Sequence, residues 1–192
     1  MITGIIMAAG FSRRMNRDKL TLEIGGVTVV ERVIRAVKGS KVEDMVIVYR
    51  TNRIRELGEK YGIKPLYNQK AELGQSESIK LGINNSSKET TGFMFFVGDQ
   101  PFLNSDIINR LIEVFQAGHY PIIVPEYRGQ RGNPVIFSSS LKNELLGLEG
   151  DSGGRSIIKK RYNDIKTVPI DNDILGKDMD TWEEYQCLMT LL

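Results

Sequence analysis

The chain has 192 residues, of which 41% are hydrophobic and 26% are charged, and its formal net charge is +2. These are ordinary globular proportions, and they exclude a disordered tail protein, a collagen-like fibre and a disulfide scaffold. The near balance of charge argues against a protein whose main task is to coat nucleic acid. At this length we expect a single domain over residues 1–192 with its own hydrophobic core.

Cysteine and histidine are scarce. The one cysteine, Cys187, excludes an intrachain disulfide and a multi-cysteine metal site. The one histidine, His119, excludes mechanisms that need paired imidazoles. The N-terminal apolar run lacks the preceding positive charge of a secretory signal, and no apolar stretch approaches the ~20 residues of a membrane span. We therefore expect a cytoplasmic protein with neither membrane nor nucleic acid as a partner.

The apolar pattern alternates between short continuous runs and helical periods. Strands are predicted, in chain order, over residues 2–7, 45–49, 93–97, 122–124, 134–137 and 165–170. Helices are predicted between Thr28 and Gly39, over 52–61 and 76–83, between Ser105 and Gly118, and over 139–146, 155–162 and 182–191.

Strands that alternate with helices of this length are typical of βαβ units. The pattern therefore predicts a three-layer α/β fold, in which helices cover both faces of a mostly parallel sheet. Ser105 is expected to cap its helix, and Thr28 with Glu31 and Thr181 with Glu184 have the spacing of capping boxes. Irregular structure is expected over residues 8–19 and 127–133.

A small-residue, basic loop follows the first predicted strand, where parallel sheets bind their ligands. Its Ala8, Ala9 and Gly10 let a ligand approach backbone N–H groups, which can cradle phosphate oxygens. Arg13, Arg14 and Lys19 follow, and would neutralise a polyphosphate. The spacing of a Walker A loop and of G-x-G-x-x-G is absent. The alternative is an ordinary strand-to-helix turn with exposed arginines.

Acidic residues are expected at the same edge. Asp99 leaves the most hydrophobic strand, which we take to be the central one, and is well placed to hold Mg²⁺ through oxygen. Asp178 and Asp180 precede the last helix and could complete the site. The alternative is that Asp99 caps a loop and that the other two carboxylates are merely solvated.

Several motifs occur together in one order along the chain. They are M-A-A-G-x-S-x-R-M followed by K-L, G-D-Q-P-F, Y-R-G-Q-R-G-N-P-V-I-F, G-D-S-G-G-R-S-I-I and D-M-D-T. This series, from Ile5 to Tyr185, resembles the molybdenum cofactor cytidylyltransferase family, within the nucleotidyltransferases of Rossmann-like fold. The segment G-Q-S-x-S-I-K-x-G (Gly74 to Gly82) is similar to the branch associated with maturation of molybdenum hydroxylases.

The resemblance implies a Mg²⁺-dependent reaction in which CTP and a molybdopterin-type cofactor give the cytosine dinucleotide form and pyrophosphate. The attacking phosphate is already anionic, so catalysis reduces to positioning and charge stabilisation, for which one histidine is no obstacle. By position, Ala8, Ala9 and Gly10 would contact the nucleotide and Arg14 and Lys19 its phosphates. Asp99 would hold the metal together with Asp180, our stronger choice, or Asp178.

Base and acceptor contacts are expected from further residues, the acceptor contacts because residues 127–134 combine two arginines with glycines beside a strand. Related guanylyltransferases carry a glycine where Ala9 stands, which favours CTP here. Polar contacts to the base or ribose are expected from Asn68, Ser76 and Ser78, and the alternative for them is a turn residue and a helix cap. Arg131 and Asn133 are expected to contact the acceptor, and the alternative is a glycine-rich hairpin with solvated charges.

Rival functions remain at this stage. They are the same chemistry with GTP or another nucleotide and a different phosphorylated acceptor, such as a sugar phosphate, and a non-catalytic chaperone that carries the cofactor to an apo molybdenum hydroxylase. The segment G-D-S-G-G around Ser152 resembles a serine-protease nucleophile. That chemistry requires a histidine base, and His119 follows a helix end in an α/β pattern, so we expect a glycine-rich turn instead.

Overall fold

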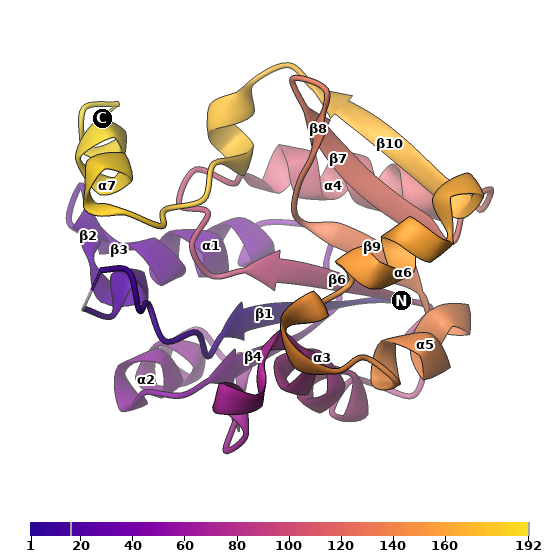
Figure 1. Cartoon of the computed structure of the whole chain (residues 1–192), viewed down its shortest axis with the longest axis horizontal. Helices are drawn as coiled ribbons and strands as arrows, with labels where there is room; N and C mark the ends of the chain where they lie inside the picture. The colour runs from indigo at the N-terminus through magenta and orange to yellow at the C-terminus, as the bar shows by residue number, and fades with distance from the viewer. Residues whose placement is uncertain (16, 192) are drawn as a thin grey trace.

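The structure is a computed structural model, and it describes residues 1–15 and 17–191. Its main sheet has the strand order β10-β7-β9-β6-β1-β4-β5, and the short strand β8 pairs with β7 beside this path (Figure 1). The strands are β1 (Ile2–Ala8), β4 (Asp44–Tyr49), β5 (Lys64–Tyr67), β6 (Gly92–Val97), β7 (Ile122–Tyr127), β8 (Gln130–Arg131), β9 (Val135–Ser138) and β10 (Ile165–Ile170).

The sheet is mostly parallel, as the sequence predicts. Strand β1 lies parallel between β4 and β6, and β10 lies parallel to β7. Only β8 and β9 run antiparallel to their partners in this sheet. Strand β6 is the middle member of the seven-strand path, so the prediction that residues 93–97 form the central strand is confirmed. A separate hairpin joins β2 (Glu23–Ile24) to β3 (Val27–Thr28).

Side chains along the central strands alternate between two hydrophobic cores, one on each face of the sheet. Met94 and Phe96 of β6 point into one cluster, and Phe93 and Phe95 point into the other. Successive side chains of a strand face opposite sides of a sheet, and a strand buried on both sides therefore reads as an unbroken apolar run. This is why the sequence signal of residues 93–97 is so strong.

Helices cover both faces of the sheet, which gives the three layers expected. The first face packs against α1 (Val29–Lys38), α2 (Asn52–Lys60) and α4 (Ser105–Gln116). The second face packs against α3 (Gln75–Asn84), α5 (Lys142–Leu146) and α6 (Arg155–Lys160). The last helix, α7 (Trp182–Met189), stands at one end of the molecule beside the β2–β3 hairpin (Figure 1).

Helix caps agree with the sequence with one shift. The Thr181 hydroxyl and the Glu184 carboxylate form the expected capping box at α7. Thr28 caps α1 by accepting a hydrogen bond from the Glu31 N–H, but the capping box predicted there is not completed, because the Glu31 carboxylate bonds to Tyr61, Lys60 and Arg35 instead. The prediction for α4 is wrong by one residue, because Asn104, in extended backbone conformation, accepts from the Ile107 N–H. Asn and Ser are equally good caps, so backbone conformation decides between neighbours.

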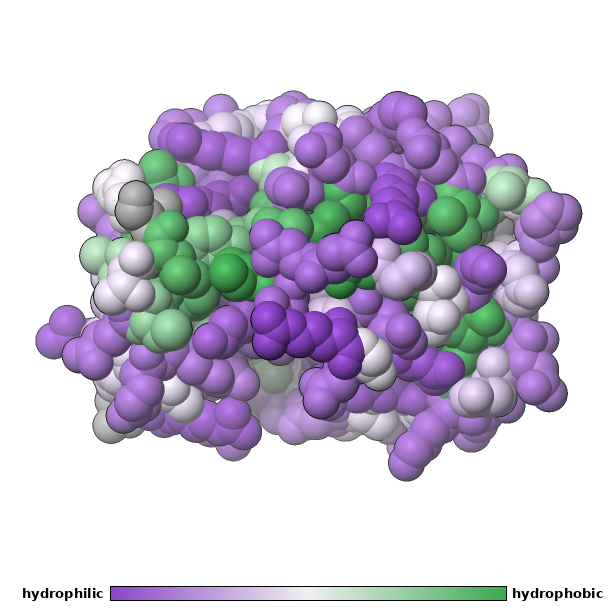
Figure 2. Space-filling view, turned by 90° about the horizontal axis from the view of Figure 1, so that it is seen from above, coloured by the Kyte–Doolittle hydropathy of each residue, from purple (hydrophilic) through white to green (hydrophobic). Residues whose placement is uncertain are grey.

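Segments expected to be irregular contain short elements. Of residues 8–19, Ala8 still belongs to β1, the described residues after it hold no strand or α-helix, and a 3-10 turn begins at Lys19. Residues 127–133 are not wholly irregular, since β8 forms there as the return strand of a tight hairpin. Seen from above, the surface is mainly hydrophilic, with apolar side chains at the left and in patches that continue across the middle to the right (Figure 2). On α7, Trp182 and Met189 are exposed.

Candidate active site

A cleft of about 620 Å³ opens at the carboxyl ends of β1 and β6. Parallel sheets present their ligand sites at this edge. Part of its lining comes from the loop after β1, including Ala9, Gly10 and Arg13. The rest comes from the end of β6, from the start of α3 and from loops much later in the chain. Both charged groups expected from the sequence, the basic loop and the acidic strand end, therefore meet in one cleft.

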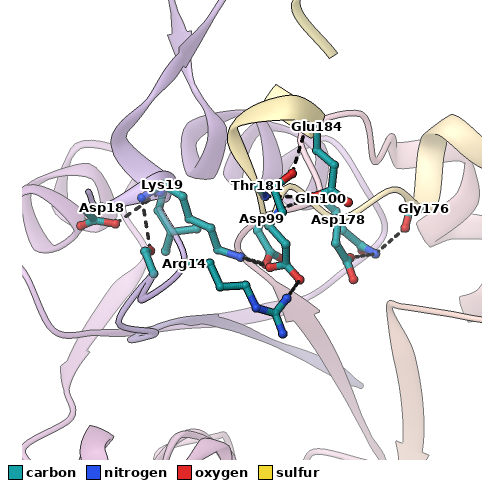
Figure 3. A network of polar contacts seen from close by, with 12 residues as sticks. Arg14, Asp18, Lys19, Asp99, Gln100, Gly176, Asp178, Thr181 and Glu184 are labelled. Atoms are coloured by element: carbon teal, nitrogen blue, oxygen red, sulfur yellow. Dashed lines mark hydrogen bonds and ion pairs between the residues drawn. The ribbon is translucent and has the colours of Figure 1, made fainter. Parts of the chain in front are cut away.

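Lys19 lies between two carboxylates in this cleft. Its Nζ donates to Asp99 Oδ2 at 2.5 Å (Figure 3). It also donates to Asp180 Oδ1 at 2.7 Å. The Lys19 side chain is 14% exposed. Burial lowers the pKa of Lys19, but the charge of Asp99 and the hydrogen bonds with both carboxylates outweigh burial and raise it overall. The ammonium is therefore held charged at the point where the two acids converge.

The capping box of α7 fixes Asp180 in place. The Glu184 carboxylate accepts from the backbone N–H of Asp180 at 2.6 Å and from that of Thr181 at 2.9 Å. The hydrogen bond with Lys19 is the main reason why the pKa of Asp180 lies below its usual range. Arg14 Nη1 also contacts Asp180 Oδ2 at 3.1 Å, although this pair is largely exposed and weak in energy.

Asp178 takes a different partner from Asp180. Its Oδ1 accepts from Gln100 Nε2 at 2.8 Å. Although the residue as a whole is exposed, protein atoms crowd its carboxyl group; this loss of hydration, followed by the negative charge of Asp99, raises the pKa of Asp178 to about 6. Of the two acids before α7, Asp180 is the one that shares Lys19 with Asp99.

The basic loop is braced from inside and from the side. The Ser12 hydroxyl accepts from the Lys19 N–H at 3.2 Å, and Ser12 itself has a left-handed backbone with φ 49°. Phe11 lies beneath two guanidinium groups, with Arg50 Cζ 4.5 Å and Arg13 Cζ 5.6 Å from its ring centroid. Cation–π contacts of this kind hold an exposed loop in shape. Sequence reasoning missed Phe11 and Arg50, although Phe11 stands inside the quoted motif.

The other expected nucleotide contacts separate into two groups. Ala9, Gly10, Arg13 and Ser78 line the cleft. Ala8, Asn68 and Ser76 are buried at 4% exposure or less and do not belong to its lining. Asn68 Nδ2 donates to Ser78 Oγ at 3.0 Å, so it orients a side chain that does reach the cleft.

Arg131 and Asn133 lie away from the cleft lining: Arg131 belongs to the β7–β8 hairpin, and Asn133 lies just after it, before β9. The Arg131 guanidinium is 5.2 Å from the ring centroid of Tyr162, an aromatic residue that is 68% exposed. The Asn133 carbonyl accepts from the Tyr127 hydroxyl at 2.9 Å. The end of the hairpin is thus anchored through the Asn133 carbonyl, and the exposed Arg131 packs against Tyr162.

The glycine-rich turn near Ser152 closes one wall of the cleft. Asp151 lines it and accepts from the Gln75 N–H at 3.2 Å, at the start of α3. Gly74, with φ 108°, packs so tightly on the Gly150 backbone that a side chain would overlap it. Sequence reasoning identified a turn here but missed the contact with α3, because residues 74 and 150 are joined only by folding.

The donor chemistry of the site fits a divalent cation. Asp99 and Asp180 are hard oxygen donors that already converge on one cation, the Lys19 ammonium, and such carboxylates are the ligands that Mg²⁺ and Mn²⁺ prefer. Within residues 1–15 and 17–191, no group of three or more His, Cys, Asp or Glu side chains is gathered as a metal site. None of the helices described is long and apolar enough to cross a membrane.

Comparison with known proteins now decides the family. Residues 4–165 match the family model described as the MobA-like NTP transferase domain. The chain belongs to this family. It is therefore a nucleotidyltransferase, and the resemblance drawn from its motifs is confirmed.

Individual relatives of this MobA-like chain include proteins linked to molybdenum cofactor. It is 29% identical over 196 residues to the purine catabolism protein PucB of Bacillus subtilis, covering 96% of this chain and 94% of that one. It is 27% identical over 153 residues to a probable molybdenum cofactor guanylyltransferase of Pyrococcus furiosus, covering 77% and 73% of the two chains.

Solved structures show the same fold. Rv0371c of Mycobacterium tuberculosis superposes with a TM-score of 0.87 at 24% identity, covering 98% of this chain and 97% of that one. A second structure of Rv0371c, described as a complex with manganese, gives a TM-score of 0.85 at 23% identity and covers 100% and 99%. The expected α/β nucleotidyltransferase fold is thereby confirmed.

Proposed function

We propose that this chain is a divalent-metal-dependent cytidylyltransferase that transfers CMP from CTP to the terminal phosphate of a molybdopterin-type cofactor and releases pyrophosphate. We further propose that residues 1–192 form one domain. The dinucleotide product would serve the maturation of a molybdenum hydroxylase. The observation that carries it is the meeting of Lys19, Asp99 and Asp180 in a cleft walled by the loop after β1.

The residues of the cleft supply binding and charge stabilisation. Backbone N–H groups around Gly10, together with Arg13 and Arg14, are suited to the triphosphate. Lys19, already cationic and partly desolvated, is suited to the charge that develops on the phosphate oxygens during transfer. The acceptor phosphate is itself an anionic nucleophile, so no side-chain base is needed.

Asp99 and Asp180 are the proposed ligands for Mg²⁺ or Mn²⁺. When bound, the metal ion would neutralise phosphate charge as a Lewis acid. The two carboxylates hold their positions through different elements, Asp99 at the end of β6 and Asp180 at the capping box of α7. The manganese complex of Rv0371c supports a divalent metal in this fold. Asp178, bonded to Gln100, is left as a supporting carboxylate rather than a first choice of ligand.

Pyrophosphate release tests the proposal directly. The purified protein is incubated with Mg²⁺, molybdopterin-type cofactor and each nucleoside triphosphate in turn. We expect release with CTP and its loss in Asp99→Asn, with Asp106→Asn on α4 as a matched control that keeps full activity. Release with GTP alone would overturn the base assignment. Cofactor binding with no release from any nucleotide would support a chaperone and refute the transferase.

Base choice has its own test at Ala9, which is buried and lines the cleft. Related guanylyltransferases resemble this chain but carry glycine there. We expect Ala9→Gly to shift the ratio of kcat/KM toward GTP by roughly 5–150-fold, the range of a methyl-sized change of ~1–3 kcal/mol. A ratio that stays constant would place base selection elsewhere in the cleft.

A further inference from the structure

Gln100 forms an unusual buried contact beside the proposed metal ligands. It directly follows Asp99 and is 1% exposed. Its Nε2 donates both to the Gly176 carbonyl at 2.9 Å and to Asp178 Oδ1 at 2.8 Å (Figure 3). One amide thus joins the end of β6 to a segment that lies more than 70 residues later in the chain.

The Gln100 side chain also has an unfavourable feature, a buried oxygen without a hydrogen-bond partner, which packing alone does not explain. Gln100 Oε1 is buried and has no hydrogen-bond partner. An unpaired buried acceptor is unfavourable, and an apolar side chain of similar size would avoid it. Such a group directly beside a residue that lines the cleft points to a positioning role for the donor end of the amide.

Contacts continue from Gly176 to the β7–β8 hairpin and the residues just after it, which we call the acceptor hairpin (residues 122–133) because we expect the acceptor contacts there. Gly176 packs directly on the ring of Tyr127, and a side chain at Gly176 would overlap that ring. Tyr127 is 8% exposed, and its hydroxyl donates to the Asn133 carbonyl at 2.9 Å. Burial, followed by the nearby charge of Asp178, raises the pKa of Tyr127, so the hydroxyl keeps its proton and remains a donor.

These contacts form a continuous path from the metal-ligand edge to the hairpin. We call the set Gln100, Gly176, Tyr127 and Asn133 the bridge. It begins next to Asp99, which we assign to the nucleotide side, and ends at Asn133, just after the β7–β8 hairpin, in the segment from which we expect the acceptor contacts. A second tether, from the Met179 N–H to the Asp99 carbonyl at 3.0 Å, runs alongside it.

We propose that Gln100 and Tyr127 are positioning residues that act through this bridge and set the placement of the acceptor hairpin relative to the nucleotide. The inference rests on the proposed function, because it concerns the alignment of two substrates. Neither side chain lines the nucleotide cleft. Their loss is therefore expected to reduce transfer without reducing nucleotide affinity, since misplacement of reacting groups by about 1 Å costs up to ~100-fold in rate.

Kinetics of Gln100→Leu, Tyr127→Phe and the double variant form the main test. We expect each single variant to lower kcat by about tenfold or more with the Kd for CTP changed less than about twofold. We expect the double variant to be no slower than the worse single one, because both break one path. Gln116→Leu, an exposed glutamine at the end of α4, is the matched control and should match the unaltered protein. Additive losses would overturn the bridge.

Hydrogen–deuterium exchange supplies a readout that needs no substrate. The Gly132 N–H donates to the Pro125 carbonyl at 3.0 Å across the hairpin. In Gln100→Leu we expect faster exchange at residues 130–133 with an unchanged Tm, since removal of the orphaned oxygen offsets the lost bonds. Faster exchange throughout the sheet, or no change at the hairpin, would refute the inference. An unaltered protein that releases no pyrophosphate would refute the proposed function and leave this exchange result to stand by itself.

Discussion

Glu31 offers the sharpest test of the electrostatics of this fold. It lies on α1, is 8% exposed, and accepts hydrogen bonds from the Tyr61 hydroxyl at 2.6 Å and from Lys60 Nζ and Arg35 Nη2 at 3.0 Å each. The Tyr61 hydrogen bond is the largest cause, and the two cations add to it against the opposing effect of burial. Together they lower the pKa of Glu31 from 4.5 to about 2.

The pKa sets the size and direction of the effect. A carboxyl whose pKa is lower in the folded state stabilises the fold above its unfolded pKa, and this stability is lost as pH falls toward the folded pKa. The difference between the unfolded and folded pKa of Glu31 corresponds to a contribution of about 3 kcal/mol to the free energy of unfolding at neutral pH. About 1.4 kcal/mol of this should be lost between pH 7 and about pH 3.5. Glu31→Gln cannot show this part of the pH dependence, because its amide does not titrate.

Urea unfolding at both pH values measures the effect. We expect Glu31→Gln to be clearly less stable at pH 7 and the gap to the unaltered protein to narrow by about 1.4 kcal/mol at about pH 3.5. Glu113→Gln is the control, since Glu113 pairs with Lys41 and both side chains are 60% exposed, and it should change stability by less than about 1 kcal/mol. A gap that is equal at both pH values would refute the reasoning.

Two further predictions concern the cleft. Lys19→Met should lower kcat/KM for pyrophosphate release by about 100–1,000-fold. It should also tighten the binding of Mn²⁺ in the absence of nucleotide, because the Lys19 ammonium no longer competes for Asp99 and Asp180. Unchanged or weaker Mn²⁺ affinity, measured by electron paramagnetic resonance, would contradict this competition. Gly74→Ala should destabilise the fold by about 1–3 kcal/mol and weaken CTP binding, since it combines left-handed φ with overlap on the Gly150 backbone. Gly118→Ala is the control, because Gly118 also has a positive φ of 82° but has room for a side chain, and it should lower the free energy of unfolding in urea by only about 1 kcal/mol. If both variants lose the same stability, the overlap between residue 74 and the Gly150 backbone is relieved by a local shift.

Local sequence determined most elements and the order in which they occur. The unbroken apolar run of residues 93–97 predicts a strand that is buried on both faces of the sheet. The spacing of Thr181 and Glu184 predicts the start of α7. These signals are local because strand and helix periods act over neighbouring residues. The motifs also named the family, whose model matches residues 4–165.

Two-residue strands lay beyond this kind of reasoning. The β2–β3 hairpin and β8 are too short to show a period of two, so they exist only because a partner strand lies beside them. Strand β5, over Lys64–Tyr67, was missed as well, since Leu66 is its one buried residue. The antiparallel direction of β9 likewise depends on where the chain returns.

The sequence by itself determined which residues are available to the site: a small basic loop ending at Lys19, and acids at Asp99, Asp178 and Asp180. Only the tertiary structure decided how they divide. It paired Lys19 with Asp99 and Asp180, gave Asp178 to Gln100, and turned Arg131 toward Tyr162. The physical reason is separation along the chain. Contacts between residues 80 or 161 positions apart leave no local pattern, and they are fixed only when the sheet brings its strand ends to one edge.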